Sequence, residues 1–181
     1  MEFYDVIKKR QSISKYKGEE VCKGSIANMI DAAMRAPSWK NKSAFKIIII
    51  DDQNIKADVA SSILNKDDKA KDAVKEAPIL AVVVAEPDKS GEVDGKEFYL
   101  VDGAIAMEHF ILAATAEGYG TMWIAALEEE KVKQTLNIPK DIKIIGITPV
   151  GIPAEIKEHN AKKDIKDYVF INKYSNPYIE K

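Results

Sequence analysis

The chain is poor in the residues that build disulfides and metal sites. Its 181 residues include one cysteine, Cys22, and two histidines, His109 and His159. A single cysteine excludes a disulfide within the chain and a cysteine-based metal cluster, and two histidines argue against a zinc site. Cys22 precedes Lys23, which is able to lower a thiol pKa, but no histidine lies near it in sequence. We interpret it as a structural thiol, with a reactive thiol as the alternative.

Long basic runs and long apolar runs are also missing. The formal net charge is -2 and no extended Lys/Arg run is present, which argues against a nucleic-acid binder. No apolar run approaches the roughly 20 residues needed to cross a bilayer. Charges interrupt the apolar start of residues 1–10, which excludes a secretory signal. We therefore expect a cytoplasmic protein.

Glycine and proline are sparse, with 9 and 7 residues, while 46% of the chain is hydrophobic and 31% is charged. This composition is typical of a soluble globular protein. A chain of 181 residues is long enough to bury one core and too short for two independent ones. We expect one domain over residues 1–181.

The periodicity of apolar residues predicts alternating helices and strands. Helices are expected over 2–9, 25–35, about 54–65, 69–76, 99–117 and 128–136. Strands are expected over 45–50, 79–85, 122–125 and 142–150, with a fifth candidate at 168–171. Ser25 is the candidate N-cap of the second helix, and Pro37 ends that helix. Residues 86–92 are expected to form an exposed polar loop.

The predicted helix over 99–117 is apolar on all sides, and such a helix must be covered on all sides. A subunit interface is the cover we expect, and a central core helix in a monomer is the alternative. Glu108 and His109 lie within this helix as an apparent acid and base. Adjacent helical residues point about 100° apart, so we interpret the pair as structural.

Two segments carry residues suited to binding a phosphorylated ligand. Arg10, Ser12 and Ser14 follow the first predicted helix, and a guanidinium with nearby hydroxyls is what a phosphate monoester requires. Pro37 to Asn41 follow the second predicted helix and offer small and polar groups from irregular backbone. Neither segment by itself establishes a binding site, because similar residues are common at helix ends that bind no ligand.

Together the two segments resemble the FMN-dependent nitroreductase family. The order and spacing of Arg10-Gln11-Ser12-Ile13-Ser14-Lys15-Tyr16 and Ala36-Pro37-Ser38-Trp39-Lys40-Asn41 are similar to the family's two N-terminal motifs. Further similar strings follow at residues 76–78, 102–106, 117–124, 136–139 and 150–153, so the resemblance covers nearly the whole chain. It implies an α+β fold of three layers, in which helices flank a central, mostly antiparallel sheet. It also implies an intertwined homodimer that holds FMN between its two chains.

The resemblance implies a set of cofactor-binding residues and neither a metal site nor a catalytic side chain. Near the phosphate and the ring edge it places Arg10, Gln11, Ser12 and Ser14. From the partner chain it places Pro37, Ser38, Trp39 and Asn41. At the other face of the flavin it places Ile124, Ala125 and Ala126, and at a C-terminal phosphate clamp Lys162 and Lys163. Two solvated lysines are the alternative interpretation of that last pair.

Several positions depart from the family pattern. Ser14 replaces a customary Arg or Lys, which removes a cation near the phosphate. Ala125 and Ala126 replace glycines, and their methyl groups narrow the approach of backbone to flavin. Ser43-Ala44-Phe45 replaces Gln-Pro-Trp, which removes a glutamine contact. Trp39 is expected either to stack on the ring or substrate, or to lie in the subunit interface.

The function implied is that of an FMN-dependent oxidoreductase. It would pass a hydride from NAD(P)H through flavin N5 to small electron-poor acceptors such as nitroaromatics or quinones, with ping-pong kinetics. One alternative is specialised flavin chemistry, such as dehalogenation, unsaturated-bond reduction or flavin breakdown. Another is a flavin-binding dimer without turnover. By the same resemblance, the aromatic tail over residues 166–181 packs against the partner subunit.

Overall fold

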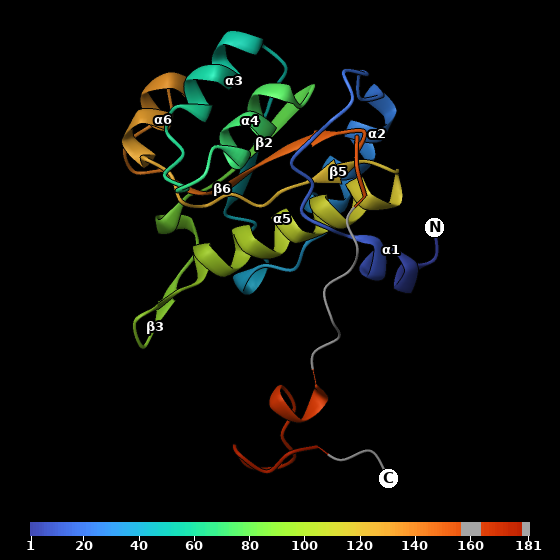
Figure 1. Ribbon diagram of the computed structural model, residues 1–181. Coiled ribbons are helices and arrows are strands. Elements are labelled where there is room, and N and C mark those ends of the chain that lie inside the picture. The colour runs from blue at the N-terminus through green and yellow to red at the C-terminus, as the bar shows by residue number, and fades with distance from the viewer. Residues whose placement is uncertain (157–163, 179–181) are drawn as a thin grey trace.

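The computed structural model describes residues 1–156 and 164–178. Secondary structure elements follow one another in the chain order that Figure 1 shows. The elements are α1 (Phe3–Lys9), α2 (Lys23–Met34), η1 (Trp39–Asn41), β1 (Phe45–Ile50), α3 (Gln53–Ala60), α4 (Lys69–Glu76), β2 (Ile79–Ala85), η2 (Pro87–Lys89), β3 (Glu92–Val93), β4 (Lys96–Glu97), α5 (Phe98–Ala116), β5 (Gly120–Thr121), α6 (Glu129–Leu136), β6 (Lys143–Gly151) and η3 (Ile165–Asp167).

A four-stranded sheet with the order β1-β2-β6-β5 forms the centre of the fold, and every neighbouring pair is antiparallel. All seven residues of β2 are buried. A strand that is apolar along its whole length must be covered on both faces. Strands β1 and β6 pair with the two edges of β2, and helices cover its two faces. A separate two-stranded hairpin, β3 and β4, precedes α5.

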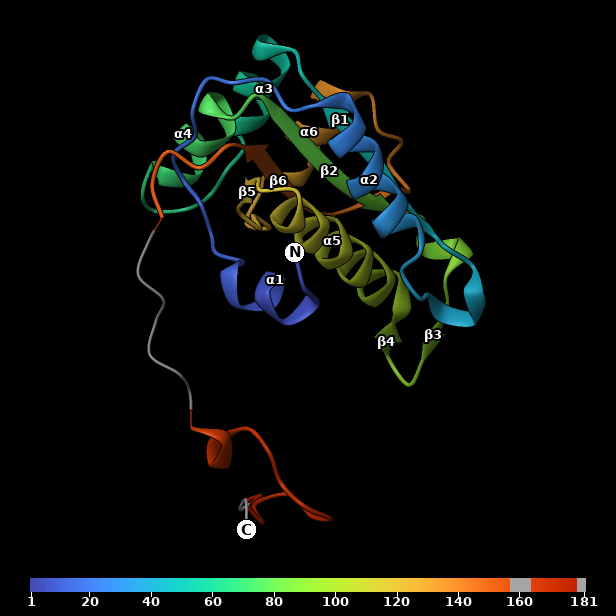
Figure 2. The same cartoon turned by 90° about the vertical axis from the view of Figure 1, so that its right-hand side faces the viewer.

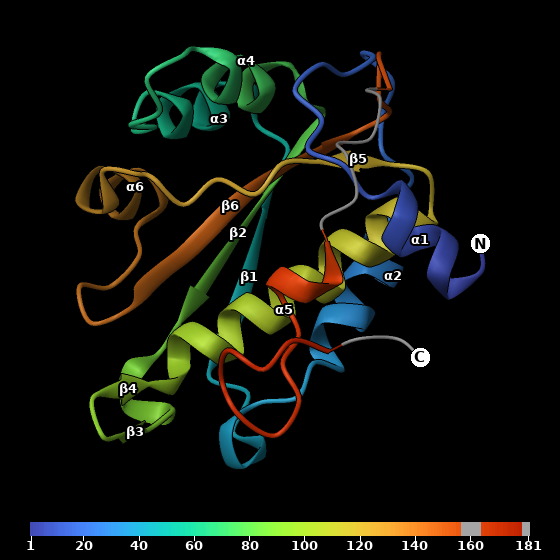
Figure 3. The ribbon, with the colours of Figure 1, turned by 60° about the horizontal axis from the view of Figure 1, so that its bottom comes forward.

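Helices form layers on both sides of this sheet (Figures 1 and 3). One face carries α3, α4 and α6, whose apolar residues form one core cluster with β2 and β6. The other face carries α2 and α5, where Met29 and Phe110 are fully buried. The predicted α+β arrangement of three layers around an antiparallel sheet is therefore confirmed.

Helix α5 runs along the sheet and organises the second layer. Gly103 faces β6 so closely that a Cβ atom there would lie 2.4 Å from Ile145 Cγ1. Only glycine permits this approach. In the part of the chain that the structure describes, α5 is the one helix long and apolar enough to cross a membrane, although no such segment was expected. Half of that stretch is buried inside the fold, as in a helix of a protein core.

The burial of α5 is incomplete in one chain, so this chain alone does not supply the cover that we expect from a subunit interface. Leu100 and Val101 are 48% and 47% exposed. Helix α1, which contacts α5, also leaves Phe3 and Tyr4 65% and 75% exposed. These are exposed apolar side chains on two helices, and nothing among the described residues covers them.

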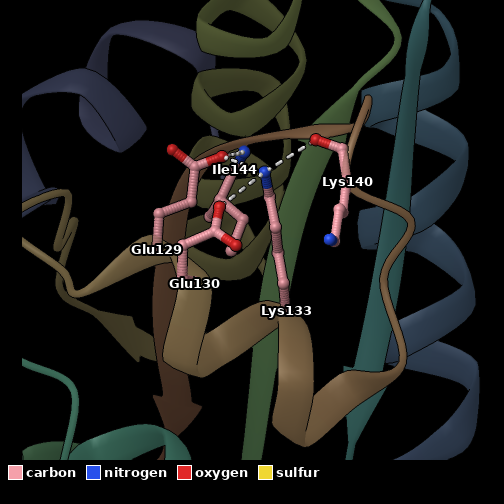
Figure 4. Close-up of polar contacts among 5 residues, drawn as sticks. All are labelled: Glu129, Glu130, Lys133, Lys140 and Ile144. Carbon is pink, nitrogen blue, oxygen red and sulfur yellow. Dashed lines mark hydrogen bonds and ion pairs between the residues drawn. The ribbon is translucent and has the colours of Figure 1, made fainter.

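A buried lysine fastens α6 to the strand that follows it (Figure 4). The Lys133 side chain is 4% exposed, and its Nζ lies 2.9 Å from Glu129 Oε1 and 3.4 Å from Glu130 Oε1. It also donates to the carbonyl oxygen of Lys140, at 3.1 Å. Glu129 in turn accepts a bond from the Ile144 N–H. Burial alone lowers the pKa of Lys133, but hydrogen bonds to the two glutamates outweigh it and raise that pKa.

Three predicted boundaries are wrong. Helix α2 begins at Lys23 with Cys22 at the N-cap, because Ser25 Oγ donates instead to Glu117 on α5. Helix α3 ends at Ala60 rather than at residue 65. The strand expected over 122–125 is absent: β5 covers Gly120–Thr121, and Ile124 makes a single bridge to Ile147.

Two predicted loop or strand assignments also differ from the structure. The segment 86–92 contains the short helix η2, and Ser90 within it is buried at 3% exposure. At 168–171 no strand forms, and Phe170 makes one isolated bridge to Pro177. The described tail, 164–178, stands apart from the sheet and its helices in Figures 1 and 2. Its side chains are open to solvent, with Tyr174 87% exposed.

Candidate functional site

The first candidate segment, residues 10–14, lies along the edge of the sheet. Helix α1 ends at Lys9, and the extended chain that follows pairs with β5 through a parallel bridge between Ser12 and Thr121. The Ile13 N–H donates to the Thr121 carbonyl oxygen at 2.8 Å. Ile13 packs directly on Gly120, where a Cβ atom would lie 2.7 Å from Ile13 Cγ1. The absent side chain of Gly120 thus sets the position of this segment.

Side chains of this segment and of Lys15, which follows it, line two different cavities. Gln11 and Ile13 line a cavity of about 420 Å³ with residues from the end of α5 and from β5. Ser14, which is 8% exposed, lines a second cavity of about 250 Å³ together with Lys15 and Lys69. Lys15 forms an exposed ion pair with Glu155 at 3.5 Å.

Arg10 has the environment of an anion-binding group. It is half-buried at the C-cap of α1. Across the described ranges, 1–156 and 164–178, its guanidinium has neither a hydrogen-bond acceptor nor an ion-pair partner. A partly buried guanidinium ordinarily binds a carboxylate or a phosphate, so this donor set, with the Ser12 hydroxyl two residues on, fits a phosphate monoester.

Residues 124–126 follow β5 in the chain, and Ile124 lies against Gly146, which also faces Met107 in the middle of α5. Ile124 is 3% exposed, and its N–H and C=O both pair with Ile147, so its side chain and its backbone belong to the core. Ala125 and Ala126 are exposed. The Ala126 carbonyl accepts from Leu64 N–H, but the N–H groups of the two alanines meet no acceptor among the residues described. Two unused backbone donors therefore remain beside the sheet edge.

The second candidate segment, Pro37 to Asn41, lies at the other end of α5. Trp39 N–H donates to Asp102 Oδ1 at 2.7 Å, and its indole stacks on Phe98 with ring centroids 3.9 Å apart and planes 12° from parallel. Ser38 Oγ accepts from the Ser43 N–H at 2.9 Å. Trp39 thus stacks on a residue of its own chain, while Pro37 is exposed nearby.

The two groups of candidate residues do not meet within one chain. Trp39 binds Asp102 near the start of α5, whereas Ser12 pairs with Thr121 beyond its end. The helix from Asp102 to Ala116 alone separates them by about 20 Å, at 1.5 Å per residue. Figure 2 shows this arrangement, with α1 at one end of α5 and the β3–β4 hairpin at the other.

The proposed phosphate clamp, Lys162 and Lys163, lies outside the described residues. Sequence reasoning missed three residues that shape the second segment, namely Phe98, Asp102 and Ser90. One signal was available for Asp102, because it is one of only two acidic residues in the apolar sequence of α5. Its partners, Trp39 and Ser90, are not recognisable from sequence.

Comparison with known proteins gives the family. The family model described as Nitroreductase family matches residues 7–152. The chain belongs to the nitroreductase family. A solved structure of a nitroreductase family protein from Clostridium novyi NT is 47% identical, with a TM-score of 0.83, and the match covers 98% of this chain and 97% of that one. The predicted nitroreductase-like fold is therefore confirmed.

Two further proteins are similar to this nitroreductase-family chain. A Methanothermobacter thermautotrophicus protein named as an NADH dehydrogenase/NAD(P)H nitroreductase is 29% identical over 162 residues, which are 86% of this chain and 79% of that protein. An FMN-dependent nitroreductase structure from Clostridium difficile R20291 is 24% identical with a TM-score of 0.82, over 93% of this chain and 98% of that one. This second likeness concerns the fold alone. Family membership confirms that the chain is an oxidoreductase enzyme.

Proposed function

We propose that this oxidoreductase binds FMN as a homodimer and uses NAD(P)H to reduce small electron-poor acceptors such as nitroaromatics or quinones. The observation that carries the proposal is the separation of the two candidate segments along α5. Residues 10–14 lie beyond the end of α5 and residues 37–41 lie near its start, so the two segments complete a site only when a second copy supplies the missing half. The relative named for NAD(P)H and the fold neighbour named for FMN support the cofactors.

Residues 10–14 and 124–126 fit the demands of FMN. Arg10, which has no ion-pair partner among the described residues, offers a cation for the phosphate, and Ser12 carries a hydroxyl two residues on. Ala125 and Ala126, which follow β5 in the chain, offer N–H donors for the edge of the ring, and these donors meet no acceptor within residues 1–156 and 164–178. FMN, when bound, supplies the two-electron chemistry between a reduced nicotinamide and an acceptor.

Under this proposal the chain's own residues hold the flavin and orient the nicotinamide and the acceptor, and none of these residues transfers a proton. Fixed N–H donors aimed at a site where negative charge develops stabilise that charge without reorganising, and the Ala125 and Ala126 amides are such donors. Gln11 and Ser14 line the cavities on either side of the edge segment. Donor and acceptor use one pocket in turn, which gives ping-pong kinetics.

The exposed apolar side chains of α1 and α5 support the dimer. Phe3 and Tyr4 of α1 and Leu100 and Val101 of α5 all stand open in one chain. A second copy that covers them would gain roughly 25 cal/mol for each Å² of apolar surface removed from water. The tail over 164–178 carries exposed aromatic residues and lies away from the sheet and helices of its own chain. We propose that this tail packs against the partner subunit.

Subunit complementation tests the shared site. Arg10→Ala impairs the first segment, and Asn41→Gly removes an amide from the second while keeping a residue suited to the left-handed backbone there, φ 56°. In a heterodimer of the two variants, one site carries both changes and the other carries neither. We expect each homodimer to bind FMN weakly and the heterodimer to regain one tight site of two. Weak binding at both heterodimer sites would contradict a site shared between chains.

A further inference from the structure

Asp102 is a buried carboxylate that the proposed chemistry does not use. It lies in the second turn of α5 and is 1% exposed. Its Oδ1 accepts the Trp39 N–H at 2.7 Å, and its Oδ2 accepts the Ser90 hydroxyl at 3.0 Å. No lysine or arginine pairs with it among the residues described. Burying a charge is costly unless hydrogen bonds compensate, and both compensating bonds go to loops.

Those two loops meet around Trp39. Phe98 lies one helical turn before Asp102, so the same face of α5 holds the Trp39 ring by stacking and its backbone by the carboxylate. Gly91 completes the fit, because a Cβ atom there would lie 2.6 Å from Trp39 Nε1. Lys42 Nζ also donates to the Ser90 carbonyl oxygen at 3.0 Å, which ties the loops together again.

The backbone next to Trp39 is held in an unfavourable conformation. Lys40, Asn41 and Ser43 have φ angles of 50°, 56° and 47°. Residues other than glycine adopt the left-handed region at a cost, and such a run persists only where surrounding contacts over-determine it. Strain of this kind clusters at ligand-binding segments. The bond from the Trp39 N–H to the buried Asp102 side chain anchors this run to the helix.

We infer that Asp102 is a positioning residue, which acts through the Trp39 N–H to hold residues 37–43 as a preformed wall of the partner's flavin and acceptor site. This inference rests on the proposed function, because it assigns the wall to that site. Preorganisation lowers the ordering cost of binding, so loss of the anchor weakens binding without removing any group that touches the ligand.

The test uses Trp39 fluorescence as a reporter that needs no cofactor. The chain has two tryptophans, so Trp123→Phe leaves Trp39 as the sole one. In that background we compare Asp102→Ala, Asp102→Asn and Asp88→Ala. Asparagine keeps an oxygen for the Trp39 N–H and an amide that donates to the Ser90 oxygen, whereas alanine keeps neither. Asp88 is an exposed carboxylate of the adjoining loop and serves as the matched control.

We expect Asp102→Ala to red-shift the Trp39 emission of the apoprotein and to raise the FMN dissociation constant and the acceptor KM by about tenfold, the effect of one lost bond to a charged group. Asp102→Asn should stay within about threefold of the parent, since both hydrogen bonds survive. Asp88→Ala should leave the Trp39 emission, the FMN dissociation constant and the acceptor KM unchanged. A folded Asp102→Ala with unshifted emission and unchanged FMN affinity would overturn the assignment. An Asp102→Asn variant with the red shift and the loss of FMN affinity expected of Asp102→Ala would overturn it too.

A second variant covers the case in which Asp102→Ala does not fold. Gly91→Ala leaves the carboxylate intact but pushes a methyl group against Trp39 Nε1. We expect the same red shift and the same loss of FMN affinity, and normal values of both would overturn the inference. Failure of the proposed function gives a different result: the parent protein then binds no FMN, while the emission shift still reports whether Asp102 holds the loop.

Discussion

Gly120→Ala tests whether the sheet edge sets the geometry of the candidate site. The added Cβ atom would lie 2.7, 2.9 and 3.0 Å from three atoms of Ile13, whereas ordinary contacts begin at 3.4 Å. Ile13 must therefore retreat by roughly 0.7 Å, the difference between 3.4 and 2.7 Å. Overpacking of this kind typically costs about 1 to 3 kcal/mol of unfolding free energy. Arg10 and Ser12 belong to the same extended segment and should shift together with Ile13, so FMN affinity should fall as well.

Urea denaturation and FMN titration of the same preparations measure both effects. Gly18→Ala is the matched control, because a Cβ atom at Gly18 meets nothing within 4 Å. It should leave FMN affinity unchanged and alter stability by no more than about 1 kcal/mol, in the stabilising direction.

A double-mutant cycle identifies the clash itself. Ile13→Ala removes two of the three close atoms, so combining it with Gly120→Ala should cost less than the sum of the two single changes. Equal unfolding free energies of Gly120→Ala and Gly18→Ala would show that the added Cβ atom at position 120 causes no clash. Strict additivity in the cycle would refute the assignment to Ile13.

Three further predictions follow from charged and polar groups. Arg10→Ala should weaken FMN binding by about 1 to 3 kcal/mol in a fluorescence titration, and the exposed Lys8→Ala should not. Lys133→Met should lower the unfolding free energy by about 1 to 3 kcal/mol. Since the pKa of Lys133 is raised on folding, this difference should hold at neutral pH and disappear as pH rises through that pKa, in urea unfolding across pH. Backbone hydrogen bonds from Ser25 and Gly24 lower the pKa of the exposed Cys22 thiol. The pH at which its alkylation by iodoacetamide reaches half the maximal rate should therefore be lower in the folded protein than in the same protein unfolded in urea, and an equal or higher midpoint in the folded protein would contradict this lowering.

The long elements were predictable because their apolar patterns decide their burial. The unbroken apolar run Ile79–Ala85 predicts a strand, and the structure has it with the same bounds. The apolar run Phe98–Ala116 similarly gives α5 within a residue of the predicted range. In such segments, burial of apolar area outweighs local preferences.

Short elements were harder because distant partners decide them. The run Met122–Ala125 has strand composition, yet Ile124 alone finds a bridge partner, in β6. Ser25 has the chemistry of an N-cap, but its hydroxyl donates to Glu117, which is 92 residues away in sequence. No local pattern encodes such a contact.

The candidate site was predictable as a set of residues and not as an arrangement. The resemblance marks Arg10 and Trp39 by their motifs, but sequence order does not show that they end about 20 Å apart along α5. The importance of Asp102 likewise emerges only from its bonds to two loops. A carboxylate within an apolar helix is visible in sequence, whereas its partners depend on the tertiary fold.

FMN-dependent oxidoreduction is the activity that we propose for this chain. An anaerobic absorbance titration of the FMN-reconstituted protein with NADH and NADPH, followed by a nitroaromatic or a quinone, tests it most directly. We expect bleaching at about 450 nm, in the absorption band of oxidised flavin, and recovery of that band when the oxidant is added. Protein that takes up no FMN, or bound FMN that neither nicotinamide bleaches, would rule out this activity.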